Sequence, residues 1–196
     1  LGLDRLEEAA RGLGLGERTG IDLPQEKRGL VPSKSWYDRR WGANGWRPGL
    51  MLNLAIGQGE LLTTPLQLAL MTGEVAMRGR TVQPHLIQEV RGVSGFGAPR
   101  SPRPRLRVDE ATWDAVHLAM ERVVDVGTGT AARVPGLRIA GKTGSAQNPH
   151  GKTHALFVCY APVENPTIAL AFVVENSGHG GSVCAPLAAQ VLRVLF

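Results

Sequence analysis

The chain has 196 residues, of which 43% are hydrophobic and 20% charged, so it can form one domain or a large part of one and lacks the composition of a disordered chain. It contains no apolar run near the ~20 residues of a membrane-spanning helix, and its two cysteines lack the spacing of a zinc site or a disulfide framework. The net charge of +5 suits nucleic acid, anionic lipid or an acidic polymer, and charge alone does not choose among them.

The first quarter of the chain is predicted to be a helix followed by a loop. The stretch DRLEEAARGLGLG places leucine and alanine at helical spacing before a glycine run that ends the helix. Residues 19–49 have no sustained period, and we expect an ordered loop there. Its tryptophans, with arginines beside them, could stack on bases, but packing in the core or loop is the more frequent role, and contact with glycan or a membrane polymerase is a third interpretation. They are Trp36, Trp41 and Trp46.

A helix start signal follows at Thr64. Pro65 occupies the first helical position and Gln67 lies three residues after the threonine, which is the pattern of a capping box. The helix is expected to continue to a stop at Gly79. After it, residues 81–90 predict a short edge strand, and RGVSGFGAPRSPRPRLR predicts a loop.

The rest of the chain predicts one more helix and a terminal sheet. VDEATWDAVHLAMERVVDV is amphipathic, with Asp109 placed as its N-cap. RIAGKTGSAQ, THALFVCYAP and TIALAFVVEN are bounded by turn signals and predict strands, the last two joined as an antiparallel hairpin. VCAPLAAQVLRVLF predicts an apolar helix packed on this sheet. Helices followed by a terminal antiparallel sheet give an α+β fold class.

The lysine of GKTGS, Lys142, has three interpretations. GLRIAGKT fits the letters of a phosphate-binding loop, but Ile139 and Ala140 would place apolar residues inside that loop, and the glycines and proline after Thr143 prevent a helix. An ordinary hairpin strand is the better explanation of the K-T-G triplet taken alone. The third interpretation is one wall of an acyl-transfer site, because K-T-G on a strand is the third signature of the serine acyl-transferases that react with penicillin.

Four further blocks favour the acyl-transfer interpretation. In chain order they are TGIDLPQEKRGLVPS, WRPGLMLNLAIGQGELLTTPLQLA, GTGTAARVPGLRIAGKTGSAQ and HALFVCYAPVENPTIALAFVVENSGHGGSVCAPLA. With them, the chain resembles the transpeptidase domain of class B penicillin-binding proteins, of the elongation type usually called penicillin-binding protein 2. IGQG is typical of that type more than of the septal type. The blocks keep the family's order and cover nearly the whole chain.

The resemblance implies the penicillin-binding transpeptidase or serine β-lactamase-like fold. Residues 1–196 would be the C-terminal portion of one transpeptidase domain, with helices and loops to about residue 135 and the K-T-G strand, terminal hairpin and last helix over about 136–196. The implied activity is a peptidoglycan D,D-transpeptidase that cross-links stem peptides through a serine acyl-enzyme and reacts with β-lactams. It would act on the outer face of the cytoplasmic membrane, anchored by an N-terminal segment, with a membrane glycan polymerase and elongation-complex proteins as partners. No metal, cofactor or nucleic acid is implied.

The resemblance also assigns roles along the K-T-G strand. Lys142 would supply positive potential and help to move a proton, as activation of a serine hydroxyl requires. Thr143 and Ser145 would hydrogen-bond the substrate carboxylate, and the backbone N–H of Ser145 would be one oxyanion donor. Gly144 would leave room for a substrate lying along the strand. The residues expected to continue the strand and to touch the ligand are Ala146 and Gln147.

The nucleophile of the family is missing from this chain. Its first two motifs are S-x-x-K and S-x-N, and neither occurs. Because both precede LDRLEEAARGLGLG in family order, we expect the nucleophile on a segment ahead of Leu1, and we expect this chain alone to be inactive. Without the family's first strands, TIALAFVVEN would keep an open apolar edge that favours aggregation. The alternative is a non-catalytic penicillin-recognising or protein-binding homologue, and a nucleic-acid-binding domain is supported by charge alone.

Histidines and cysteines give weaker signals. His150 and His154 have the spacing of metal ligands on a helix, but they lie in a connection between strands, which does not favour a metal site. His179 lies near the mouth of the site in the family, without an assigned role. Cys159 and Cys184 could form one bridge, although two buried free thiols are the more frequent state.

Overall fold

The computed structural model describes residues 2–80, 83–87, 106 and 108–196. The chain divides into two compact units, one formed by residues 1–67 with 80–106 and the other by residues 68–79 with 107–196. Over the described part of the chain, the helices are too short or too polar to cross a membrane.

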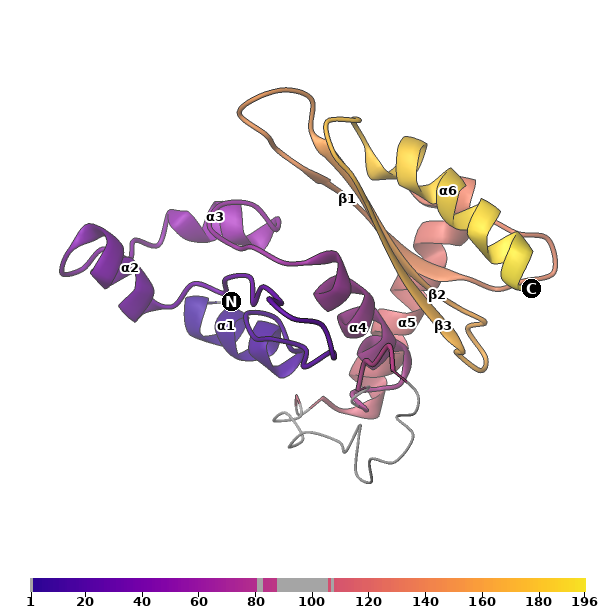
Figure 1. Ribbon diagram of the computed structural model, residues 1–196, viewed down its shortest axis with the longest axis horizontal. Coiled ribbons are helices and arrows are strands. Elements are labelled where there is room, and N and C mark those ends of the chain that lie inside the picture. The colour runs from indigo at the N-terminus through magenta and orange to yellow at the C-terminus, as the bar shows by residue number, and fades with distance from the viewer. Residues whose placement is uncertain (1, 81–82, 88–105, 107) are drawn as a thin grey trace. The chain divides into compact units, whose positions relative to one another are not determined.

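The first unit is helical and contains α1 (Leu3–Gly12), α2 (Lys34–Trp41), α3 (Leu50–Ala55) and the first turn of α4 (Pro65–Ala76), all visible in Figure 1. The prediction of a loop over residues 19–49 is wrong where α2 lies. This helix has no regular apolar period, and it is fixed instead by its N-cap Ser33, which accepts a hydrogen bond from the Trp36 N–H at 3.1 Å.

An aromatic cluster around Tyr37 forms the core of this first unit. Tyr37 is fully buried beside Leu3 and Leu54, and the rings of all three predicted loop tryptophans lie 5.1 to 5.3 Å from the Tyr37 ring. Its hydroxyl donates to a carboxylate oxygen of Glu60 at 2.8 Å. Burial and this carboxylate raise the Tyr37 pKa well above its usual value. Packing is therefore the role that the structure gives these tryptophans.

The capping box at the start of α4 is confirmed. The Gln67 side chain accepts from the Thr64 N–H at 2.9 Å, and Thr64 Oγ1 accepts from the Gln67 N–H at 3.2 Å. The edge strand predicted over 81–90 is not found in its described part, since residues 83–87 form no strand, and its other residues lie outside the described ones. The Leu86 and Ile87 N–H groups donate instead to the Asp22 carboxylate and lower its pKa.

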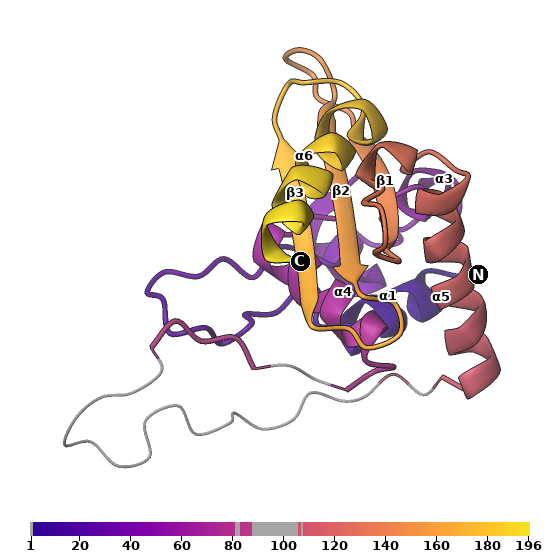
Figure 2. The same ribbon diagram turned by 90° about the vertical axis from the view of Figure 1, so that its right-hand side faces the viewer.

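The second unit holds the terminal sheet. Strands β1 (Ala140–Ala146), β2 (His154–Ala161) and β3 (Ile168–Val174) are antiparallel in the order β1-β2-β3, which confirms the predicted hairpin. Helix α6 (Gly180–Leu195) lies across one face of this sheet, as Figure 2 shows. Helix α5 (Glu110–Asp125) begins at the predicted N-cap Asp109, whose carboxylate accepts from the Thr112 N–H at 2.7 Å. A short 3₁₀ turn, η1 (Thr130–Ala132), follows α5.

Side chains of β2 point alternately to the two faces of the sheet, and apolar residues pack against both faces. Ala155, Phe157 and Cys159 point to the α6 side and pack with Cys184 and Ala188 of that helix. Tyr160 points to the other side, where it packs with Ala76 of α4 and Met120 of α5. Helices thus cover both faces of the inner end of the sheet, as the α+β prediction requires.

The two cysteines are free thiols, as the sequence favoured. Both are fully buried, and burial raises the pKa of Cys159 to about 12. Strand β3 pairs only with β2 among the described strands, so its outer edge is open. That this edge causes aggregation of the isolated chain stays a prediction.

Candidate functional site

Strand β1 changes character along its length. Ala140 and Gly141 are buried, whereas Lys142 and Ser145 are exposed and the residues between them are half-buried. Among the described strands, β1 pairs only with β2, so it forms one edge of the sheet (Figure 2). The predicted site residues therefore share the exposed end of an edge strand, which leaves backbone groups available to a peptide.

The K-T-G lysine and the two hydroxyl residues lie on opposite faces of β1. Lys142 lies opposite Val158 of β2, and its Nζ donates to the Thr143 carbonyl oxygen at 2.6 Å. Thr143 and Ser145 lie opposite Phe157 and Ala155, on the face that α6 covers. A ligand running along the edge of β1 would therefore meet a charge on one side and hydroxyls on the other.

Thr143 is held by a threonine that the sequence interpretation did not single out. Thr128 follows α5, and its Oγ1 lies 2.7 Å from the Thr143 Oγ1. The sequence signal was available, because Thr128 lies in GTGTAARVPGLRIAGKTGSAQ, one of the blocks that carry the family resemblance.

Ser145 contacts His179, the residue that precedes α6. The Ser145 Oγ lies 3.2 Å from the His179 Nδ1, across 34 positions of sequence. The structure thus brings together Lys142, Thr143 and Ser145 on β1 with Thr128 and His179 from two other segments. All five belong to the second unit.

Two glycines let the start of α6 approach the backbone of the sheet. A Cβ on Gly180 would lie 1.9 Å from the Leu156 carbonyl oxygen and 2.6 Å from the Gly144 carbonyl oxygen. A Cβ on Gly181 would lie 2.3 Å from the Thr128 carbonyl oxygen. Neither position has room for a side chain, so the start of α6 is fixed directly against β1 and β2.

The other residues predicted for the site are Gly144, Ala146 and Gln147. A Cβ on Gly144 would lie 3.3 Å from the Leu156 Cβ, so a side chain there would crowd β2 as well as the space along the strand. Ala146 is the last residue of β1. The expectation that Gln147 continues the strand is wrong, because pairing with β2 ends at the Ala146–His154 pair and a turn follows.

The other chemistries weighed for this segment do not fit its geometry. A phosphate-binding loop would place Lys142 and Thr143 at the start of a helix, and both lie inside a strand. His154 Nδ1 accepts a hydrogen bond from the Asn176 N–H at 3.1 Å. In the residues that the structure describes, no group of three or more His, Cys, Asp and Glu side chains is placed to hold a metal ion.

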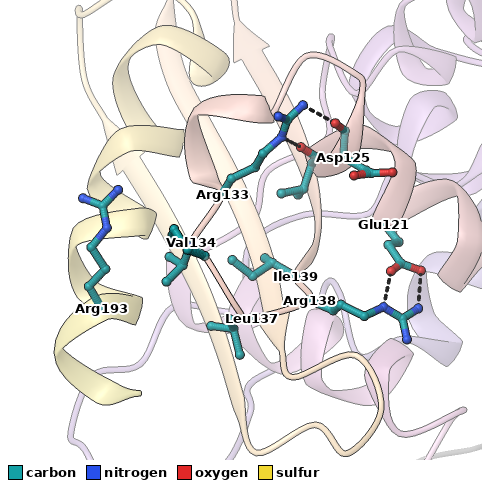
Figure 3. Close-up of a pocket in the computed structure, with 10 residues that line it drawn as sticks. Glu121, Asp125, Arg133, Val134, Leu137, Arg138, Ile139 and Arg193 are labelled. Atoms are coloured by element: carbon teal, nitrogen blue, oxygen red, sulfur yellow. Dashed lines mark hydrogen bonds and ion pairs between the residues drawn. The ribbon is translucent and has the colours of Figure 1, made fainter.

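A pocket of about 390 Å³ lies in the same unit, between α5, the segment that leads into β1 and α6 (Figure 3). Arg138 pairs there with Glu121 at 2.6 Å, and together with Glu164 this carboxylate raises the Arg138 pKa. Arg133 donates to the backbone oxygens of Val124 and Asp125. These arginines tie the segment before β1 to α5, and none of the predicted site residues lines the pocket.

Comparison with known proteins gives one consistent result. The family model for the penicillin binding protein transpeptidase domain matches residues 1–193. The peptidoglycan D,D-transpeptidase MrdA of Acinetobacter baumannii is 36% identical over 100% of this chain and 31% of its own length. The chain thus spans about a third of the length of this curated relative.

Solved structures agree with this result. The Pseudomonas aeruginosa PBP2 in complex with WCK 5153 has a TM-score of 0.89 and 39% identity, over 100% of this chain and 43% of that one. The PBP2 in the complex between PBP2 and MreC from Helicobacter pylori has a TM-score of 0.80 and 29% identity, over 99% of this chain and 36% of that one. These matches confirm the predicted fold and the resemblance to penicillin-binding protein 2.

Proposed function

The chain belongs to the penicillin-binding protein transpeptidase family, and we propose that it forms the K-T-G wall of a peptidoglycan D,D-transpeptidase. In this proposal residues 1–196 are the C-terminal portion of one transpeptidase domain. The serine nucleophile comes from outside them, since they contain no S-x-x-K. The proposed substrate is a stem peptide that ends in D-Ala-D-Ala.

The proposed reaction has two acyl transfers. The serine oxygen bonds to the carbonyl carbon of the penultimate D-Ala, the C–N bond to the last D-Ala breaks, and the released amine takes a proton. An amine of a neighbouring stem peptide then attacks the ester, forms the cross-link and returns the serine hydroxyl. Lys142 supplies positive potential and assists the proton movement, and the Ser145 N–H stabilises the oxyanion.

Recognition of the substrate is assigned to the outer half of β1. Thr143 and Ser145 present hydroxyls that can donate to the terminal carboxylate, and the open strand edge can pair with the peptide backbone. Gly144 leaves the strand surface free between them, and Ala146 continues the contact to the end of the strand. Gln147, which follows the end of β1, would contact only the far end of a bound peptide.

The observation that carries this proposal is the position of K-T-G itself. Lys142 and Thr143 lie on an edge strand at the point where it leaves the core, with Thr128 2.7 Å from the Thr143 hydroxyl and His179 3.2 Å from the Ser145 hydroxyl. A hairpin without function would need no such support from two distant segments.

The substrate also sets the location and partners that we propose. Peptidoglycan lies outside the cytoplasmic membrane, so the reaction belongs on the outer face of that membrane, with an N-terminal anchor and a membrane glycan polymerase. The PBP2 of H. pylori forms a complex with MreC, and a protein partner of the same kind is proposed here. β-Lactams would acylate the same serine.

Covalent labelling by a fluorescent penicillin tests the proposal. The full-length protein that contains this chain is expected to give a fluorescent band that survives denaturation and is abolished by excess unlabelled penicillin. Residues 1–196 alone should give no band, because they lack the nucleophile. A full-length protein that binds penicillin reversibly but never forms the band would support the non-catalytic homologue instead.

A further inference from the structure

His179 occupies the N-cap position of α6 without capping the helix through its side chain. Its backbone carbonyl accepts hydrogen bonds from the N–H groups of Ser182 and Val183, at 3.2 and 3.0 Å, and from the Ser182 hydroxyl at 3.1 Å. The imidazole is therefore available for another contact, and its Nδ1 lies 3.2 Å from the Ser145 Oγ.

The backbone is anchored on both sides of His179. Before it, Thr153 Oγ1 donates to the Gly178 carbonyl oxygen at 2.6 Å, and the Gly178 N–H donates to the Thr153 carbonyl oxygen at 2.9 Å. After it, Gly180 packs against the carbonyl oxygens of Leu156 and Gly144 with no room for a Cβ. These contacts hold the backbone of His179 beside β1, and the contact with Ser145 Oγ places the imidazole there.

The hydrogen bond with His179 is one contact that affects what Ser145 can offer to a ligand. A serine hydroxyl has one proton, and to bind a carboxylate it must donate that proton to the ligand. If Nδ1 carries a hydrogen and donates to Ser145 Oγ, His179 does not use the hydroxyl proton, and Ser145 can donate that proton to a bound carboxylate. If Nδ1 instead accepted a hydrogen bond from the Ser145 hydroxyl, Ser145 would present only lone pairs to the ligand and would repel an anion.

We propose that His179 is a positioning residue, which donates from Nδ1 to Ser145 Oγ and so directs the Ser145 hydroxyl proton toward the carboxylate of the stem peptide or of a penicillin. The inference rests on the proposed function of β1. It assigns to the residue before α6 a part in substrate recognition that acts only through Ser145.

The test compares a penicillin with its methyl ester on the full-length protein. His179→Ala is expected to slow acylation by the penicillin about fivefold to tenfold, the size of one hydrogen bond, and to leave acylation by the ester unchanged. His179→Asn should remain within about threefold of wild type, because its amide N–H can take the place of Nδ1–H. His150→Ala, an exposed histidine of the β1–β2 connection, is the matched control and should behave as wild type.

A second comparison connects His179 to Ser145. In a Ser145→Ala background, adding His179→Ala should cause no further loss, because the group that His179 orients is gone. Equal slowing of penicillin and ester, or wild-type rates for His179→Ala with both, would overturn the inference. A wild-type protein that reacts with neither compound would instead overturn the proposed function, so the two failures are distinguishable.

Discussion

The two halves of β1 differ in what surrounds them. Ala140 and Gly141 are closed in by helices and by the buried rings of Tyr160 and Phe157. In the outer half, by contrast, the hydroxyls of Thr143 and Ser145 contact side chains of other segments. The core half sets where the strand lies, and the outer half carries the chemistry. Stability and activity should therefore respond to different substitutions.

The largest expected effect is on the rate at which a thiol reagent modifies Cys159, which lies beside the core half of β1. Cys159 lies opposite Gly141, is fully buried, and has a pKa that burial raises to about 12. At pH 8 its thiolate is scarce and inaccessible, so modification by a thiol reagent should be at least about a thousandfold slower in the native protein than in urea. Rapid native labelling of Cys159, with Cys184→Ser as the background, would show that the core half is open.

Phe157 of β2 is one of the side chains that enclose the core half of β1. Among these side chains, its replacement in Phe157→Ala should be the most destabilising. The ring is fully buried between β1, β3 and α6, and its removal leaves a cavity that costs about 4 kcal/mol in the free energy of unfolding. Unfolding in urea measures this decrease in the free energy of unfolding. Val173→Ala, on the partly exposed side of β3, serves as control and should cost less than about 1 kcal/mol.

Gly180→Ala tests the close contact between the start of α6 and the backbone of the sheet. The added methyl group would overlap two carbonyl oxygens, so α6 must shift, at a cost of about 3 kcal/mol. Gly49→Ala adds a methyl group where no atom lies within 4 Å and should leave stability unchanged. Thermal unfolding that gives both variants the same midpoint would mean that α6 does not rest on the sheet backbone.

Thr128→Val should slow acylation by penicillin, through the outer half of β1, with little change in the free energy of unfolding. It removes the hydroxyl that lies 2.7 Å from Thr143 Oγ1 while it keeps the shape of the side chain. Because the contact is exposed, the free energy of unfolding should fall by less than about 1 kcal/mol, and acylation by penicillin should slow because Thr143 loses its orientation. A stability loss comparable to that of Phe157→Ala would place Thr128 in the core instead.

The sequence predicts most of the local structure and only part of the site. The capping box at Thr64 and the Asp109 cap depend on residues three positions apart, and the strands on alternation, so both are visible in the sequence. Helix α2 is not, because the packing of aromatic rings around Tyr37, and not an apolar period, stabilises it. The Asp22 contacts similarly replace the edge strand expected near residue 86.

The support of the site is nonlocal and could not be derived from spacing. Lys142, Thr143 and Ser145 are consecutive or nearly so and are found through the K-T-G triplet. Thr128 and His179 lie 15 and 34 positions from their partners, and the packing of α5 and of the start of α6 on the sheet brings them to β1. The glycines at 180 and 181 lie within one of the family blocks, but the structural reason for them is visible only in the close contacts that they permit.

The most direct measurement is the rate of acylation by a fluorescent penicillin in two lysine variants of the full-length protein. Lys142→Ala should react at least about a hundredfold more slowly, because it removes positive charge and proton transfer at the site. Its free energy of unfolding should change by no more than about 0.5 kcal/mol, since Lys142 is exposed. Lys152→Ala, an exposed lysine in the connection after β1, should react as wild type. A Lys142→Ala protein that is acylated at the wild-type rate would contradict the assignment of β1 as the wall of an acyl-transfer site.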